Sequence, residues 1–274
     1  MHPDLFQFGP FAVKAYGLML ALSFFLGVWL AVYRARKAHL DEKQMIDLSF
    51  IIMVAALIGS RFFYVIYHMD EFAGHWIDTI NPFQSSGQVG IAGLSMMGGM
   101  VLAIIAAILY FIIKKITPWP LMDVMAPSFF LGEALTRIGC FFNGCCFGKP
   151  THSFCGVIFP PDSMAGWVFP NTAIWPTQIF SSIAGFVMVG LLLLAERKKT
   201  FNGYTFFIAL AMYSIWRFFI DFYRYYEDSM IFLQIGNIGL SRNQFLCICL
   251  LIIAIWWFVY LKRKNEKALN GDRQ

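Results

Sequence analysis

Residues 92–115 read AGLSMMGGMVLAIIAAILYFIIKK, and no charged residue lies between Ala92 and Ile113. A helix needs about 20 mostly apolar residues to cross the hydrocarbon core of a bilayer, and this run is long enough. Lys114 and Lys115, which close the run, are typical of the cytoplasmic end of a transmembrane helix. The segment therefore predicts a membrane-spanning helix that ends in the cytoplasm.

The rest of the chain repeats this pattern. Hydrophobic residues make up 59% of the chain and charged residues only 14%, which is typical of a polytopic membrane protein. Apolar runs predict seven transmembrane helices, at residues 15–33, 46–68, 92–113, 121–141, 177–195, 203–222 and 243–261. We expect an all-α integral membrane protein in which residues 1–274 form one polytopic domain. No basic n-region lies between His2 and Phe11, so the first span is expected to be a retained helix.

Lysines and arginines alternate between the two sides of these spans. Fourteen of the 21 fall on one side, namely Arg34, Arg36, Lys37, Lys43, Lys114, Lys115, Arg197, Lys198, Lys199, Lys262, Arg263, Lys264, Lys267 and Arg273. The positive-inside rule assigns this side to the cytoplasm, so we expect the N-terminus outside and the C-terminus inside. Because topology explains the net charge of +5, that charge does not indicate nucleic-acid binding.

The other seven basic residues fall inside spans or on the outer side. They are Lys14, Arg61, Arg137, Lys149, Arg217, Arg224 and Arg242. A charged side chain at the centre of a span costs about 3 kcal/mol on insertion scales, and it usually faces the bundle interior or a wet cavity. Lys14 and Arg242 can equally snorkel to the outer headgroups. Long apolar stretches flank Arg61, Arg137 and Arg217, which makes these three candidates for a buried site.

Carboxylates accompany two of these arginines at helical spacing. Glu133 and Arg137 are four residues apart in the fourth span. Arg217, Asp221 and Arg224 are expected to form a stripe along one face of the sixth. Such pairs either only neutralise charge or contribute guanidiniums that bind a phosphate bidentately. The pattern favours a site for an anionic phospholipid headgroup in the outer leaflet.

Two long connections are predicted on the outer side, at residues 70–91 and 142–176. Prolines throughout the second connection predict a loop or short interfacial elements in place of a helix. Gly139, Gly144 and Gly148 stand where the fourth span meets this connection. The favoured interpretation is a helix end capped by glycines, and the alternative is a turn that presents backbone N–H groups to a phosphate beside Arg137.

At these residues the chain resembles the prolipoprotein diacylglyceryl transferase family, whose signature is Gly-Arg-x-Gly-Asn-Phe-x-Asn-Gly-Glu-x-x-Gly. The matching residues are Arg137, Gly139, Phe141, Asn143, Gly144 and Gly148. Further matches follow in the family's order along almost the whole chain: Tyr16 to Met19, Gly59 to Arg61 with Tyr64, Gly98 and Gly99, Asp123 and Pro127, Pro176 and Gln178, Arg217 and Arg224, and Asn243 with Gln244.

The resemblance implies a multi-pass enzyme of the bacterial cytoplasmic (inner) membrane that needs no cofactor and no metal. Members transfer the diacylglyceryl group of phosphatidylglycerol to the lipobox cysteine thiol of a secreted preprolipoprotein at the outer leaflet, and they release glycerol phosphate. Such a reaction needs cations beside the leaving phosphate and a deprotonated thiol. The expected catalytic residues are Arg137, Arg217, Glu133 and Asp221. The expected substrate-binding residues are Tyr16, Arg61, Asn143, Gly144, Gly148, Gly98, Gly99, Gln178 and Arg224.

The chain departs from the family pattern where a proton would be handled. The replacements are Met97 for a histidine, Cys145 and Asp221 for glutamates, Cys140 for an asparagine, and Trp175 and Phe180 for polar residues. Methionine cannot relay a proton, and cysteine is a poor substitute for a carboxylate. Glu133 stands where the family is apolar. It could act as the general base, but pairing with Arg137 is the favoured interpretation.

Four of the six cysteines, Cys140, Cys145, Cys146 and Cys155, are predicted on the outer side. In an oxidising cell envelope they predict a structural disulfide. Adjacent cysteines have Cα atoms only about 3.8 Å apart, so the bridge is expected to join Cys145 or Cys146 to Cys140 or Cys155. The spacing C-x4-C-C-x8-C is not typical of a zinc site, which is therefore not favoured.

Three functional classes follow from these observations. The first is the family's transferase. The second is a paralogue that transfers a phospholipid-derived group to another acceptor, with one of its own cysteines as a covalent relay. The third is a membrane protein that exchanges disulfides with partners on the outer side. The substitutions favour the paralogue, whereas the breadth of the resemblance favours the transferase, which is the function we expect.

Overall fold

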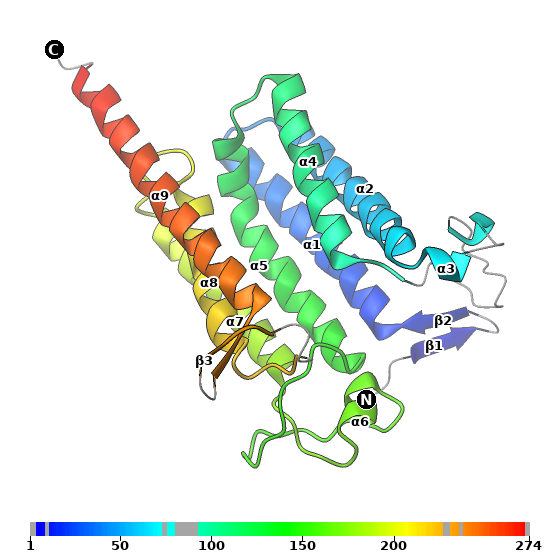
Figure 1. Ribbon diagram of the computed structural model, residues 1–274. Helices are drawn as coiled ribbons and strands as arrows, with labels where there is room; N and C mark the ends of the chain where they lie inside the picture. Colours follow the sequence, from blue (N-terminus) through cyan, green and yellow to red (C-terminus); the bar gives the residue numbers. More distant parts are fainter. Residues whose placement is uncertain are drawn as a thin grey trace. The chain divides into compact units, whose positions relative to one another are not determined.

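The computed structural model describes residues 4–8, 11–72, 76–79, 93–226, 231–235 and 238–271 (Figure 1). Its elements in chain order are β1 (Asp4–Phe8), β2 (Phe11–Lys14), α1 (Ala15–Lys37), α2 (Glu42–Tyr67), α3 (Met69–Phe72), η1 (Trp76–Thr79), α4 (Met96–Lys114), α5 (Pro118–Phe142), α6 (Met164–Val168), α7 (Thr177–Glu196), α8 (Tyr204–Ile220), β3 (Ile231–Ile235), β4 (Ile238–Ser241) and α9 (Arg242–Gly271).

A helix lies at each of the seven predicted spans. Five helices are long and apolar enough to cross a membrane: α1, α2, α4, α7 and residues 242–268 of α9. The apolar helix α8 is shorter, with 17 residues, and α5 carries three charged residues, Asp123, Glu133 and Arg137. The prediction of a helical membrane protein is thus supported, and the number of spans and their orientation stay predictions. Two short hairpins, β1–β2 and β3–β4, were not predicted.

Contacts between Cα atoms divide the chain into two compact units, which we describe separately. The first comprises Met1–Phe6, Val13–Arg34 and Trp119–Gln274, and the second comprises Gln7–Ala12 and Ala35–Pro118. The prediction of one polytopic domain stays a prediction.

The first unit is built on α5, α7, α8 and α9, with α1 packed along α5. Its core contains Phe130 of α5, Met188 and Leu192 of α7, and Ala209 of α8. Figure 1 shows α8 beside α7 and α9, which are its main neighbours in the structure. Burial of these apolar faces fixes the ends of α5 and α8, from which the candidate site is built.

The buried carboxylate of Asp123 joins α5 to the start of α8. It is 0% exposed and accepts hydrogen bonds from the backbone N–H groups of Gly203 (2.7 Å) and Phe206 (2.9 Å). Lys199 Nζ lies 2.9 Å from Asp123 Oδ2, the same oxygen that accepts from Gly203. Because Gly203 has no side chain to cap α8, the carboxylate from α5 satisfies the free N–H groups of the first turn.

We expect Asp123→Ala to destabilise the protein by about 3 kcal/mol, since two N–H groups and Lys199 lose their acceptor at once. The midpoint of thermal unfolding in detergent measures this effect. Lys199→Ala is the matched control, and it should cost less because Asp123 keeps both N–H donors. An equal loss in the two variants would contradict the capping role.

In the second unit, α2 and α4 pack antiparallel. Gly98 and Gly99 are buried in this contact, and a Cβ at Gly99 would lie 3.0 Å from the Ala56 carbonyl oxygen.

Arg61 Nε donates to the Thr79 carbonyl (2.8 Å) and Nη1 to the Gly93 carbonyl (3.1 Å). Helix packing and anchoring of the connection after α2 are thus visible roles for these residues. Their predicted roles in substrate binding stay predictions. Residues 73–75 and 80–92 lie outside the described residues.

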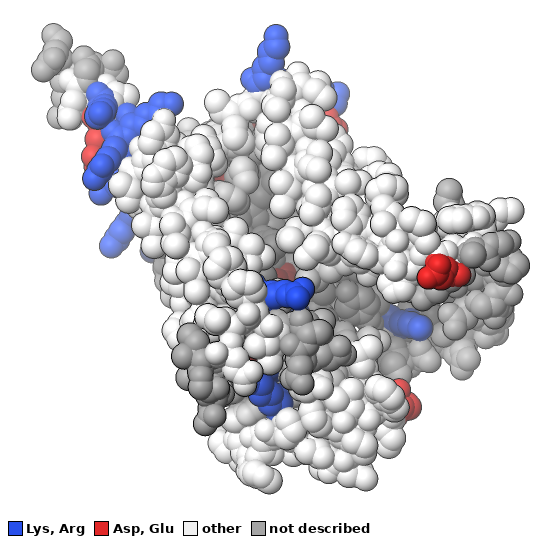
Figure 2. Space-filling model, viewed as in Figure 1, with Lys and Arg blue, Asp and Glu red and all other residues white. Residues whose placement is uncertain are grey.

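Charge is unevenly distributed on the surface. Figure 2 shows basic side chains gathered around the C-terminal part of α9, while most of the face in view carries no charged residue. The sequence there includes Lys262, Arg263, Lys264 and Lys267. This distribution fits the predicted cytoplasmic end of the last span.

Candidate functional site

The site is built around the end of α5, where the glycine-rich segment turns. The backbone N–H groups of Asn143, Gly144 and Cys145 donate to the carbonyls of residues 139, 141 and 140, and Gly144 has φ +66°. The Gly148 N–H donates to the Trp175 carbonyl. These donors are therefore used within the chain. The structure supports the favoured interpretation of a capped helix end, and the N–H groups of these four residues are not free to form a phosphate cradle.

The predicted pair on α5 is present. Arg137 Nη2 lies 3.4 Å from Glu133 Oε1, and the two side chains are 18% and 14% exposed. Tyr213 of α8 interacts electrostatically with both residues and with Arg217, so it lies near both charged pairs. The pairing partly neutralises Arg137 and, among the described residues, occupies one of its five N–H donors.

The predicted pair on α8 is also present and forms part of a larger network. Arg217 Nη1 lies 3.2 Å from Asp221 Oδ1, and Arg217 Nη2 donates to the Tyr226 hydroxyl at 2.9 Å. Tyr226 donates to the same carboxylate oxygen at 2.8 Å. Ser241, the last residue of β4, donates to Asp221 Oδ2 at 3.1 Å. Asp221 is 4% exposed, and its charge is balanced by Arg217 and by two hydroxyl donors.

Arg224 does not continue a stripe on α8, so this prediction is wrong. The helix ends at Ile220, and Arg224 lies beyond the following turn, where its backbone pairs with Gly148. Its guanidinium carbon is 5.4 Å from the centre of the Tyr226 ring. Arg224 is 9% exposed, and its Nε has no hydrogen-bond partner among the described residues. A buried guanidinium N–H without an acceptor is costly, so this donor fits a site that receives an anion.

The start of α7 holds the loop after α5 in place. Gln178 Nε2 donates to the Cys145 carbonyl at 2.8 Å, and Thr177 Oγ1 donates to the Cys146 carbonyl at 2.9 Å. Gln178 is 1% exposed, and its side-chain amide oxygen, Oε1, has no hydrogen-bond partner among the described residues. Gly148 lies between the backbones of Trp175 and Tyr223. A Cβ at Gly148 would lie 2.5 Å from the Trp175 carbonyl oxygen and 2.8 Å from the Tyr223 carbonyl oxygen. Gln178 and Gly148 thus position the loop.

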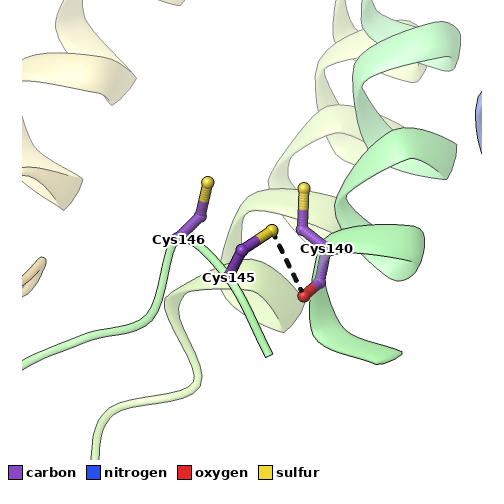
Figure 3. Close-up of side chains that lie close together, drawn as sticks. All are labelled: Cys140, Cys145 and Cys146. Carbon is purple, nitrogen blue, oxygen red and sulfur yellow. Dashed lines mark hydrogen bonds between the residues drawn. The ribbon is translucent and has the colours of Figure 1, made fainter. Parts of the chain in front are cut away.

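Three cysteines converge at the end of α5. The sulfur atoms of Cys140, Cys145 and Cys146 all lie within 4.8 Å of one another (Figure 3). The expected disulfide is absent, because all six cysteines are free in the structure, and Cys155 does not belong to the cluster. Arg224 and Arg137 interact electrostatically with Cys146, and two positive charges of this kind favour a thiolate over a thiol. The thiolate is the form of cysteine that binds metals and attacks electrophiles.

The other predicted site residues of the first unit lie around this cluster. Tyr16 of α1 faces the last turn of α5, with its Cα 3.3 Å from a Cβ built at Gly139. Its phenol interacts electrostatically with Arg137 and the three cysteines. Asn143 is exposed in the turn. The structure therefore brings together ten of the predicted residues: Tyr16, Glu133, Arg137, Asn143, Gly144, Gly148, Gln178, Arg217, Asp221 and Arg224.

An aromatic groove of about 270 Å³ adjoins this region. It is lined by Trp175, Phe180, Trp216, Phe219, Ile220 and Tyr223. The groove shares Trp175 and Tyr223 with the segments that hold the loop after α5, since the Trp175 carbonyl accepts from Gly148 and the Tyr223 carbonyl accepts from Lys149. An apolar groove of this kind suits the hydrocarbon tail of a ligand.

Sequence reasoning missed Tyr213, Tyr226 and Ser241. Tyr226 lies nine residues after Arg217 and beyond the helix end, so helical spacing does not connect them. Ser241 reaches Asp221 through the β3–β4 hairpin, which was not predicted. The one available signal was Tyr213, which is four residues before Arg217 and therefore on the same face of a helix.

Glu133→Gln distinguishes the two interpretations of Glu133. If Glu133 only pairs with Arg137, an amide keeps the contact and turnover should fall less than about tenfold, whereas losing a general base costs about 10²-fold or more. We expect the smaller effect in a steady-state lipid-transfer assay. Glu133→Ala is the matched control for loss of the contact itself. A fall of hundredfold or more already in the glutamine variant, equal to the fall in the alanine variant, would assign Glu133 the role of base.

Comparisons with known proteins show which family the chain resembles over almost its whole length. The model of the family described as prolipoprotein diacylglyceryl transferase matches residues 3–260. A protein of Clostridium botulinum named phosphatidylglycerol–prolipoprotein diacylglyceryl transferase is 30% identical over 267 residues, which cover 97% of this chain and 99% of the relative. Proteins of the same name from Bacillus cytotoxicus and Bacillus licheniformis are 31% and 29% identical, and the chain covers 92% and 95% of them.

Proposed function

Since the chain belongs to the prolipoprotein diacylglyceryl transferase family and is thus a transferase, we propose that it uses phosphatidylglycerol and a preprolipoprotein as substrates. The diacylglyceryl group would move to the lipobox cysteine thiol at the outer leaflet. A carbon–sulfur bond forms, the bond between the glyceryl carbon and the phosphate oxygen breaks, and glycerol phosphate leaves. The proton of the thiol passes to water before or during attack, and the electrons of the broken carbon–oxygen bond stay on the glycerol phosphate.

The observation that carries this proposal is the arginine arrangement of the first unit. Arg137 on α5 and Arg217 on α8 are each held by a carboxylate four residues away in the sequence, and the buried Nε of Arg224 has no acceptor among the described residues. Negative charge develops on the phosphate as its bond to carbon breaks. Fixed guanidiniums in a water-poor site stabilise that charge with little reorganisation. Arg137, Arg217 and Arg224 are therefore proposed to bind the phosphate, and Tyr16 to contact the headgroup.

The aromatic groove supports a lipid substrate. Its lining of Trp175, Phe180 and Tyr223 would accept a hydrocarbon chain, while the arginines of the site would meet the headgroup. Two residues of this lining stand where the family pattern is polar. We propose that the groove holds one acyl chain of phosphatidylglycerol.

The proposed topology follows from the charge distribution. With seven spans, an external N-terminus and the basic end of α9 in the cytoplasm, the end of α5 and the loop 142–176 lie on the outer side. A secreted preprolipoprotein would meet the site there. The bacterial relatives support a location in the cytoplasmic (inner) membrane.

A covalent relay through the chain's own cysteines is not proposed. A diacylglyceryl group on Cys146 would be attached by a thioether. Passing it on would require a thiolate to leave a saturated carbon, which is far less favourable than the departure of a phosphate. A lipid adduct on the enzyme would therefore be a dead end and not an intermediate.

The test is a transfer assay with purified protein in phosphatidylglycerol vesicles and a lipobox peptide, followed by mass spectrometry. We expect the peptide to gain the mass of one diacylglyceryl group. A peptide with serine in place of the lipobox cysteine is the matched control and should gain nothing. No mass gain on the cysteine peptide, in vesicles where an established relative is active, would overturn the proposed function.

A further inference from the structure

The cluster of Cys140, Cys145 and Cys146 has the composition of a metal site. Zinc takes thiolate ligands at about 2.3 Å, which puts neighbouring sulfurs of a tetrahedral site about 3.8 Å apart. The three sulfurs, within 4.8 Å of one another, need only a small contraction to reach this spacing. A disulfide would use two of them and leave the third unpaired.

The backbone conformation brings the sulfurs together. Cys146 has φ +60°, a left-handed conformation that residues with a Cβ rarely adopt. This turn lets adjacent side chains, those of Cys145 and Cys146, converge with Cys140 on one centre (Figure 3). Unusual backbone geometry persists where the surrounding structure enforces it.

The surroundings hold the sulfurs in place. Gln178 and Thr177 bind the carbonyls of Cys145 and Cys146, and the Cys145 N–H donates to the Cys140 carbonyl at 3.1 Å. These hydrogen bonds hold the backbone of each cysteine in place. In metal sites, hydrogen bonds from surrounding groups orient the ligands in a comparable way.

The charge of the site also fits. Three thiolates and one Zn²⁺ carry a net charge of −1. Arg137 and Arg224 lie close enough to the Cys146 sulfur to interact with it electrostatically, and both cations compensate this charge. The same guanidiniums belong to the proposed phosphate site, so a bound metal and the lipid headgroup would be neighbours.

We propose that Cys140, Cys145 and Cys146 bind one zinc ion and leave its fourth position for the thiol of the acceptor peptide. This role rests on the proposed function. Sites with three protein ligands keep one coordination position open, and a coordinated thiol is deprotonated outright. The acceptor thiol gives its proton to water on binding zinc. Its sulfur then attacks the glyceryl carbon, and glycerol phosphate leaves with the electrons of the carbon–oxygen bond.

The first measurement is the metal content of the full-length protein, purified under reducing conditions and then supplied with Zn²⁺. We expect one equivalent per chain, and near none in the triple variant Cys140→Ser/Cys145→Ser/Cys146→Ser. Cys155→Ser is the matched control, since this loop cysteine lies outside the cluster and should leave the zinc content unchanged. Failure of the protein to retain zinc, or equal retention by the triple variant, would overturn the site.

The second measurement needs no variant. Co²⁺ replaces zinc in the wild-type protein, and its visible spectrum reports thiolate ligands and their number. Adding the lipobox peptide should change this spectrum, whereas the serine peptide should not. A spectrum that ignores the cysteine peptide would overturn the role in holding the acceptor, as would full transfer activity of the metal-free protein.

The two proposals can fail separately. A cobalt spectrum that responds to the cysteine peptide, without any lipid transfer, would support the metal site and sink the proposed transferase. Recovery of a disulfide between two of the three cysteines in place of bound zinc, with transfer intact, would sink the metal site and leave the transferase standing.

Discussion

Arg137→Ala is expected to lower lipid-transfer turnover at least about a hundredfold, the usual cost of removing one fixed donor from a developing oxyanion. Arg137 stands in the last turns of α5, between Glu133 and the cysteine cluster. Alanine removes the cation while the phosphate's negative charge still has to be stabilised. The transfer assay with the lipobox peptide measures the loss.

Two controls separate catalysis from folding. Arg137→Lys keeps a positive charge but loses the planar fork, so its turnover should lie between those of the wild type and Arg137→Ala. Glu133→Gln/Arg137→Ala removes the carboxylate that the alanine variant leaves unpaired. This double variant should unfold near the wild-type temperature and stay inactive. Unchanged turnover in Arg137→Ala would refute the phosphate site.

The helices and the short-range charge pairs were predictable from the sequence. Apolar runs located a helix at every predicted span. A long apolar helix makes all its backbone hydrogen bonds internally and presents apolar side chains to the lipid, so such runs are reliable signals. The pairs Glu133–Arg137 and Arg217–Asp221 followed from the spacing of four residues, and both are present. Local periodicity was sufficient for these features because both partners belong to one helix.

The features that lie beyond helix ends were not predictable in the same way. The prediction for Arg224 assumed that α8 continued past Ile220, but the chain turns there and pairs Arg224 with Gly148. Tyr226 reaches Arg217 only through this turn. Helical periodicity carries no information on where a turn directs the chain.

The cysteines show the same limit. Their shared position on the outer side was predicted, but Cys155 was grouped with the other three. The left-handed conformation of Cys146 and the anchoring by Gln178 decide which sulfurs meet. Both depend on how the loop docks on α7. Spacing in the sequence could not separate a disulfide from a cluster of three free thiols.

Arg217→Ala is expected to destabilise the protein by about 3 kcal/mol or more and to abolish transfer, because it leaves a buried carboxylate without its cation. Asp221 is 4% exposed, and its hydroxyl donors, Tyr226 and Ser241, do not replace a full positive charge. The midpoint of thermal unfolding and the transfer rate should both fall. Such a result alone would not distinguish a structural role from binding of the phosphate.

The double variant Arg217→Met/Asp221→Asn makes that distinction. Asparagine keeps an acceptor for Tyr226, methionine fills the space of the arginine stem, and no unpaired charge stays buried, so stability should return close to that of the wild type. If Arg217 binds the phosphate, transfer should remain at least about a hundredfold below the wild-type rate in this stable protein. Recovery of transfer together with stability would instead make Arg217 a purely structural residue and leave Arg137 and Arg224 to bind the headgroup.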